Sequence, residues 1–291
     1  MDKNQTKLEY FDEMWRLQCT ATLLSHLKED DDGRHVLILD RTIFYPQGGG
    51  QPPDTGFLLI HGFDNNKFLV FHYGFFENLG GKFEPTLEKG KEVSLFVDEF
   101  RRKLNSRLHS AGHLLKICLP RIGLGNLESG KAYHFPDGLS LKSDLFNTQA
   151  DCLLRTCYCI VTIVSWPWVE YKGTISQNQM QSKQKDLELE ANALISVGGK
   201  VSVDILPYDE AAKLCGGCLP DYVPKYETSG GKQFYNVRYQ PTPKLLSLLV
   251  ETGDNPRINS HVADISDIKQ IKVYQIRSKK GLTKVFYNVE S

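Results

Sequence analysis

The spacing of the apolar residues changes once along the chain, near Asp98, and this change constrains the fold more than any other feature. Before Asp98, apolar and polar residues alternate in short runs that are separated by glycine, proline and aspartate. The runs are HVLILD (35–40), FLLIHG (57–62), KFLVFHY (67–73) and EVSLFVD (92–98). Runs of this kind are typical of strands, and their close spacing predicts a small β-barrel or a barrel-like sheet.

After Asp98 the apolar residues recur at helical spacing. In EFRRKLNSRLHSAGHLLKICL (99–119) the apolar stripe consists of Leu104, Leu108, Ala111, Leu115 and Cys118. A second amphipathic helix is predicted over 176–196, ended by the glycine pair 198–199, with strands over 201–208 and 284–289. We therefore expect an α+β protein. Residues 1–98 would form a glycine-loop β-barrel domain, and residues 99–291 an α+β domain with an antiparallel sheet.

Composition narrows the class of protein. A hydrophobic fraction of 41% and a charged fraction of 24% are those of a soluble globular chain, and a formal net charge of zero gives no global sign of a nucleic-acid partner. The polar start MDKNQTKLEYFDEMW predicts no signal peptide, and no apolar run approaches the length of a membrane span. Seven irregularly spaced cysteines favour reduced thiols and a cytoplasmic protein.

The stretch NSRLHSAGHLL (105–115) places His109 and His113 one helical turn apart, so both imidazoles lie on one face. They are either half of a metal site or two polar residues on a solvated stripe. A metalloprotease motif would need glutamate directly after the first histidine. That position is Ser110, which excludes the motif.

Three stretches occur in a fixed order at wide separation: DRTIFYPQGGGQPPDTG (40–56), NSRLHSAGHLL (105–115) and HVADISDIKQIKVYQIRSKKGLTKVFYNV (261–289). Together they resemble the editing module of alanyl-tRNA synthetase and its free-standing relatives, the AlaX trans-editing proteins, in their medium-length form. The resemblance implies hydrolysis of the ester that joins serine or glycine to alanine tRNA, with tRNA as partner. The ATP-using aminoacylation core has no counterpart in the sequence, so we expect no ligase activity.

The same resemblance implies a zinc site and a metal-bearing helix. His109 and His113 match the first ligand pair, and His261 matches the histidine of a distant C-x-x-x-H motif. The cysteine position of that motif is Arg257, and arginine cannot ligate a metal. Three histidines could still hold zinc with an open fourth position. Cys215, in LCGGC (214–218), is a substitute fourth ligand or simply part of a glycine turn.

The glycine-rich stretch YPQGGGQP (45–52) has two interpretations. Gly48, Gly49 and Gly50 could form a loop that faces the aminoacylated end of the tRNA, with Gln51 as a catalytic hydrogen-bonding group. They could equally form a tight turn that needs glycine for its geometry alone.

Two local basic clusters are candidate phosphate contacts for tRNA, although such runs are commonly only solvated faces. One leads into the histidine helix and the other lies in a C-terminal hairpin. The residues predicted to bind tRNA are Arg101, Arg102, Arg107, Lys279 and Lys280.

The segment 139–166 lies between KAYHFPDG (131–138) and PWVEYKGTIS (167–176), which resemble sequence neighbours in the family. Its interior resembles nothing there. We interpret it as an unspliced intron or gene-model error, with a genuine inserted hairpin as the alternative. Arg257 could have the same origin. The alternative function is a tRNA-binding pseudoenzyme that lost zinc together with the cysteine.

Overall fold

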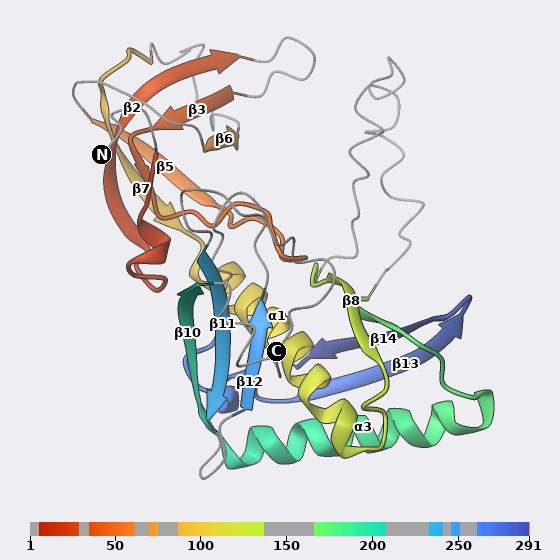
Figure 1. The fold of residues 1–291 in the computed structure, drawn as a ribbon. Coiled ribbons are helices and arrows are strands. Elements are labelled where there is room, and N and C mark those ends of the chain that lie inside the picture. The colour runs from red at the N-terminus through yellow and green to blue at the C-terminus, as the bar shows by residue number, and fades with distance from the viewer. Residues whose placement is uncertain are drawn as a thin grey trace, which may run out of the picture. The chain divides into compact units, whose positions relative to one another are not determined.

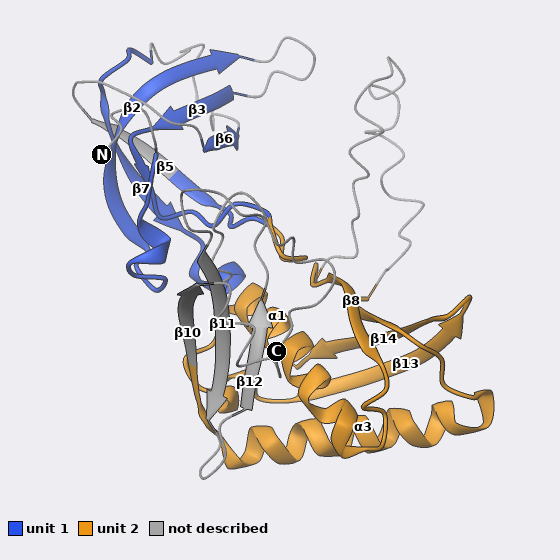
Figure 2. Cartoon of the chain, in the orientation of Figure 1, with its two compact units in different colours: residues 1–47, 53–102 blue, residues 48–52, 103–291 orange. Residues whose placement is uncertain are grey.

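The fold is taken from a computed structural model, shown in Figure 1. It describes residues 6–28, 35–61, 70–74, 87–136, 166–207, 233–240, 246–250 and 261–290. The chain divides into two compact units, coloured separately in Figure 2. The first comprises residues 1–47 and 53–102, and the second comprises residues 48–52 and 103–291.

The first unit is built on an antiparallel sheet. Its elements are β1 (Lys7–Leu8), the 3-10 turn η1 (Glu9–Phe11), β2 (Gln18–Lys28), β3 (His35–Leu39), β4 (Arg41–Thr42), β5 (Gly56–His61), β6 (Phe71–Gly74) and β7 (Glu92–Val97). Five strands pair in the order β5-β7-β2-β3-β6, and β1 pairs with β4 in parallel. The pairings among the described residues include none between β5 and β6, so closure into a barrel stays a prediction.

Alternating side chains supply the core of this unit. Val93, Leu95 and Val97 on β7 point inward, and the intervening residues of the strand are less buried. This is the alternation expected of a sheet with one buried face. Beside the core, Arg102 is fully buried and pairs with the carboxylate of Asp54, which is also buried. Breaking one partner of such a pair leaves an uncompensated charge, so Arg102 serves the stability of this unit.

The elements of the second unit are α1 (Glu99–Arg121), β8 (Glu128–Tyr133), β9 (Trp168–Lys172), α3 (Gln177–Val197), β10 (Lys200–Pro207), β11 (Gln233–Gln240), β12 (Leu246–Val250), η3 (Ile265–Ile268), β13 (Ile271–Lys279) and β14 (Leu282–Val289). The unit contains α3 and all of α1 except residues 99–102, which belong to the first unit. Four strands form an antiparallel sheet in the order β13-β14-β9-β8, and β10, β11 and β12 form a separate three-stranded antiparallel sheet.

The apolar stripe of α1 packs into the core of the second unit as the sequence predicts. Leu108, Ala111, Leu115 and Cys118 are completely buried, and Leu104 packs partly buried against them. The second helix ends where the glycine pair predicts. Gly198 has a φ of 75° and donates its N–H to the carbonyls of Leu194 and Ile195.

Polar side chains of α3 cover the edge strand β13, whose backbone would otherwise be unpaired on that side. Asn192 both donates to and accepts from the backbone of Ile271, Glu188 accepts from Val273 N–H, and Gln184 donates to the Val273 carbonyl. These hydrogen bonds occupy the first part of the β13 edge, which is therefore not a template for pairing with another chain.

The class predicted from the sequence is confirmed, since the chain is α+β with antiparallel sheets. The division at residue 98 stays a prediction. Neither helix in the described ranges is both long enough and apolar enough to cross a lipid bilayer. Cys19 and Cys118 are buried free thiols. Arg257, Cys215 and the segment 139–166 up to residue 165 lie outside the described residues.

Candidate functional site

The three histidines singled out in the sequence lie together in the second unit. His109 and His113 stack on α1 with ring centroids 4.8 Å apart, and His261 lies 4.7 Å from His109 and 5.2 Å from His113. One ring nitrogen from each can be chosen so that all lie within 4.8 Å of one another. His261 precedes η3 in the chain, so residues far apart in the sequence form this cluster.

Ser110 holds His261 against the helix. Its Oγ accepts a hydrogen bond from Val262 N–H at 3.1 Å and lies 3.2 Å from Nδ1 of His261. If the hydroxyl oxygen also accepts from Nδ1–H, the lone pair of that imidazole is on Nε2. The residue that excludes a metalloprotease motif therefore has a role of its own in the cluster.

Gln51 holds His109. Its Oε1 lies 2.9 Å from Nδ1 of His109, and because an amide oxygen only accepts, Nδ1–H must be the donor. The lone pair of the His109 ring is then on Nε2. Gln51 is completely buried, and a tight turn fixes its backbone through hydrogen bonds in both directions with Gly48. The predicted hydrogen-bonding group thus contacts a histidine of the cluster.

The glycine loop packs closely against the segment that follows β8. Gly49 and Gly50 have φ values of 56° and 78°, where side chains are disfavoured. A Cβ on Gly50 would lie 2.6 Å from the carbonyl oxygen of Ala132, and the Gly50 carbonyl accepts from His134 N–H at 2.8 Å. The positive φ and the clash of a Cβ with Ala132 require glycine at position 50. The other interpretation, a loop of Gly48, Gly49 and Gly50 that faces the aminoacylated end of the tRNA, stays a prediction.

The electrostatics of the cluster favour neutral imidazoles. Burial, reinforced by the neighbouring histidines, lowers the pKa of His109 and of His113 well below the ordinary 6.5. Burial lowers the pKa of His261 to about 3. A neutral imidazole keeps a lone pair for a metal. Nε2 of His113 is buried and has no hydrogen-bond partner within the described part of the chain. Buried polar atoms normally have a partner, so this nitrogen is available to a ligand such as a metal ion.

The donor set fits a divalent metal. Three neutral ring nitrogens at this separation are ligands that zinc accepts, and three protein ligands with one open position is the usual arrangement of catalytic zinc sites.

A fourth histidine, His134, belongs to the same cluster, and the sequence did not predict it as a site residue. It is buried, its ring stacks on His109 with centroids 4.6 Å apart, and its Nδ1 lies 2.5 Å from the hydroxyl of Tyr287. Burial lowers its pKa to about 3. A single histidine after a strand belongs to no repeating pattern, so spacing could not identify it as a site residue. Its place in KAYHF (131–135), a stretch that resembles the family, was the one available sign.

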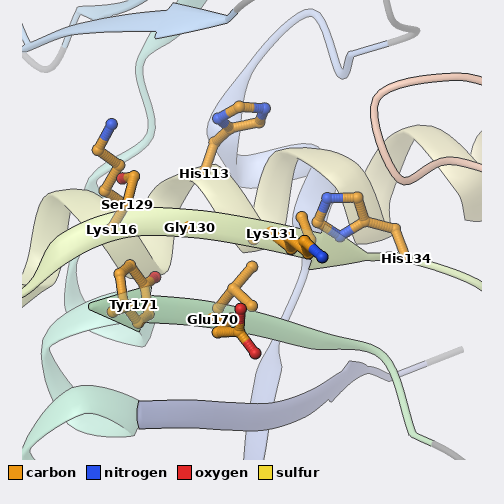
Figure 3. A pocket seen from close by; sticks show the side chains of 11 residues that line it. His113, Lys116, Ser129, Gly130, Lys131, His134, Glu170 and Tyr171 are labelled. Atoms are coloured by element: carbon orange, nitrogen blue, oxygen red, sulfur yellow. The ribbon is translucent and has the colours of Figure 1, made fainter. Parts of the chain in front are cut away.

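A small cavity of about 90 Å³ opens beside the cluster and is lined by residues of α1, β8 and β9. Figure 3 shows His113 on α1 and His134 beyond the end of β8 among the side chains that line it. Lys116 and Lys131 also line this cavity.

The predicted tRNA-binding residues differ in how accessible they are. Lys279 and Lys280 are exposed at the turn between β13 and β14, and Arg101 is half-buried. Arg102 is buried in its pair with Asp54. Arg107 donates to the backbone carbonyls of Ile268 and Glu290. The last two guanidiniums are committed to the fold, so neither is kept in the proposed tRNA surface.

No known protein-family profile matches the chain. It is 35% identical over 130 residues to an alanine–tRNA ligase of Methanothermobacter thermautotrophicus, a match covering 39% of the chain and 14% of the ligase. It is 31% identical over 120 residues to the alanyl-tRNA editing protein AlaX-L of Pyrococcus horikoshii, covering 39% of the chain and 28% of that protein. It is 34% identical over 116 residues to AlaX-M of Methanosarcina barkeri, covering 38% of the chain and 45% of that protein.

The chain thus spans less than half the length of each of these relatives. The resemblance inferred from the ordered motifs and the measured identities point to the same proteins. Over the matched part, the chain is a relative of the AlaX-type alanyl-tRNA editing proteins and of the alanine–tRNA ligases.

Proposed function

We propose that the chain is a zinc-dependent hydrolase that removes serine or glycine from wrongly charged alanine tRNA. The single observation that carries the proposal is the convergence of three imidazoles, of which His109 and His261 are buried, with ring nitrogens within 4.8 Å of one another. The relationship to alanyl-tRNA editing proteins supplies the reaction class.

There is a physical need for such an enzyme. A pocket that accepts alanine cannot strongly refuse glycine, which lacks one methyl group, or serine, which adds one hydroxyl. One such group is worth roughly 1–3 kcal/mol of discrimination. A second site that hydrolyses the wrong esters adds the missing selectivity.

Each residue of the site has a distinct role in this proposal. His109, His113 and His261 would hold the ion, and hydrogen bonds of two of these rings to the oxygens of Gln51 and Ser110 would fix their orientation. When bound, zinc supplies Lewis acidity that polarises an ester carbonyl or makes a water molecule more acidic. The cavity beside His113 is where a small part of the substrate, such as the esterified amino acid, would enter.

The tRNA itself would be held by phosphate contacts. Lys279 and Lys280 are exposed and are the proposed phosphate contacts, and Arg101 is a further candidate. Contacts of this kind give affinity that falls as salt rises, with little sequence selectivity. Location in the cytoplasm stays a prediction.

The test uses the purified full chain. We expect zinc close to equimolar with protein by metal analysis, and release of serine and glycine from mischarged alanine tRNA. His261→Ala should lose both the metal and the activity. His26→Ala, which alters a histidine of β2 in the first unit, is the matched control and should keep both.

Two further outcomes are informative. Wild-type protein that binds alanine tRNA without hydrolysing either ester would support the pseudoenzyme instead. Arg257→Cys adds the ligand that the family resemblance implies, so it should bind zinc more tightly than the wild type in competition with a chelator. Equal affinities would mean that position 257 does not face the metal.

A further inference from the structure

The hydrogen bonds around His134 determine which of its ring nitrogens carries a proton. The hydroxyl of Tyr287 donates to the carbonyl oxygen of Leu108 at 2.9 Å, which uses the only proton of that hydroxyl. Nδ1 of His134 lies 2.5 Å from the same hydroxyl oxygen and must therefore be the donor. In a neutral ring this leaves Nε2 with a bare lone pair.

Close packing holds the ring in this orientation. His134 N–H donates to the Gly50 carbonyl at 2.8 Å, and the ring stacks on His109. The absence of a side chain at Gly112 leaves room for His134 and Tyr287. A Cβ there would lie 2.5 Å from Cε1 of His134 and 2.8 Å from the Tyr287 hydroxyl oxygen. Backbone, ring face and Nδ1 are all fixed, so the position of Nε2 is fixed as well.

Of the two ring nitrogens of His134, only Nδ1 has a hydrogen-bond partner among the described residues. His134 is only 2% exposed and lines the cavity of about 90 Å³ beside His113 (Figure 3). Within the described ranges, the structure gives Nε2 no hydrogen-bond partner. A hydrogen-bond acceptor at the wall of a cavity is available to a ligand or a water molecule that enters it.

We propose that Nε2 of His134 accepts a hydrogen bond from a hydroxyl-bearing ligand in this cavity, and that Tyr287 is the positioning residue that keeps Nε2 unprotonated. The inference rests on the proposed function. The cavity has room for water or for a small side chain, since one water molecule needs only about 10–15 Å³ of such free volume. Under the proposed function, the two candidates are the attacking water and the side chain of an esterified serine.

The first test is spectroscopic and needs no activity. In metal-free protein labelled with ¹⁵N-histidine, the pair of ring nitrogen signals absent from His134→Gln identifies residue 134. We expect a protonated Nδ1 and an unprotonated Nε2 in the wild type. Tyr287→Phe should give a mixture of tautomers, because the phenol oxygen no longer selects one.

Tyr10→Phe removes a buried phenol from the first unit and is the matched control, which should leave the tautomer unchanged. A protonated Nε2 in the wild type would overturn the proposal.

The second test compares esters. His134→Leu should lower kcat on the order of tenfold or more, the size of one lost hydrogen bond to a reacting group. His134→Gln should recover part of the loss, because its amide oxygen can accept near the position of Nε2. His72→Gln, a buried histidine of the first unit, should match the wild type.

Equal losses with seryl and glycyl tRNA would assign the hydroxyl to water, and a loss with seryl tRNA alone would assign it to the serine side chain. No loss with either ester, at unchanged zinc content, would refute the proposal. An inactive wild type would contradict the proposed function instead, and the tautomer measurement would still decide the state of His134.

Discussion

At the scale of single residues, Gln51 controls the donor state of His109. Its amide oxygen accepts from Nδ1–H at 2.9 Å, so Nε2 keeps the lone pair that a metal needs. The contact is completely buried on both sides, since Gln51 is 0% and His109 is 1% exposed. Water therefore cannot replace the amide oxygen without rearrangement.

We predict that Gln51→Ala weakens zinc binding by about 10- to 100-fold, the usual effect of removing a partner that orients a metal ligand. The measurement is competition with a chromophoric chelator at pH 7. Gln51→Glu, which keeps an acceptor oxygen, should lose less. Gln47→Ala changes an exposed glutamine of the first unit and should bind zinc like the wild type. Wild-type affinity in Gln51→Ala would mean that the bond does not orient His109.

At the scale of elements, the sequence was sufficient where the signal is local. The helical stripe from Leu104 to Cys118 and the glycine stop at 198 appear in the structure as predicted. The predicted strand runs 35–40, 57–62, 67–73 and 92–98 correspond to β3, β5, β6 and β7 within a few residues. Periodicity and turn chemistry are properties of neighbouring residues, so one sequence contains them.

The long-range contacts could not be predicted in this way. The chain pairs Arg102 with Asp54 and Gln51 with His109, and nothing in the local pattern distinguishes Arg102 from its exposed neighbour Lys103. The proximity of His261 to the helix came from family resemblance and not from spacing. Such contacts depend on how the elements pack.

Gly112 tests the packing of α1 directly. In a helix interior alanine is favoured over glycine by about 1 kcal/mol. Here a Cβ would lie 2.5 Å from His134 Cε1 and 2.8 Å from the Tyr287 hydroxyl, neither of which can move freely. We therefore predict that Gly112→Ala lowers the free energy of unfolding by about 1–3 kcal/mol, as overpacking does, measured by urea denaturation.

Gly125→Ala is the matched control in the same unit. Its Cβ would meet nothing closer than 3.4 Å, so the substitution should be neutral or slightly stabilising. A stabilising Gly112→Ala would show that the His134–Tyr287 pair is not held as tightly as proposed.

At the scale of the whole molecule, buried histidines are distributed unevenly between the two units. Among the residues whose burial the structure describes, the second unit holds His109, His134, His261 and the partly exposed His113, and the first unit holds His72. Burial lowers the pKa of each of these groups, to about 4 for His72 and about 3 for His134 and His261. All five are neutral in the folded protein at neutral pH and become free to take up a proton on unfolding.

The sign of the resulting pH dependence follows from proton counting. Below the ordinary histidine pKa of about 6.5 the unfolded chain binds more protons than the folded one, so stability falls as the pH falls. The loss continues down to the lowered folded pKa values, between about pH 6.5 and pH 4 for His72 and to about pH 3 for His134 and His261. Each buried histidine contributes a slope of up to about 1.4 kcal/mol per pH unit in its window.

We predict that metal-free protein loses stability toward acid several times more steeply in the second unit than in the first, because four such groups act there against one. Hydrogen exchange with a chelator present, between pH 7 and pH 5, measures the two units separately. His72→Gln should flatten the slope of the first unit only. Equal slopes in both units would mean that only about one of the four imidazoles takes up a proton on unfolding, which would contradict a cluster of four neutral rings.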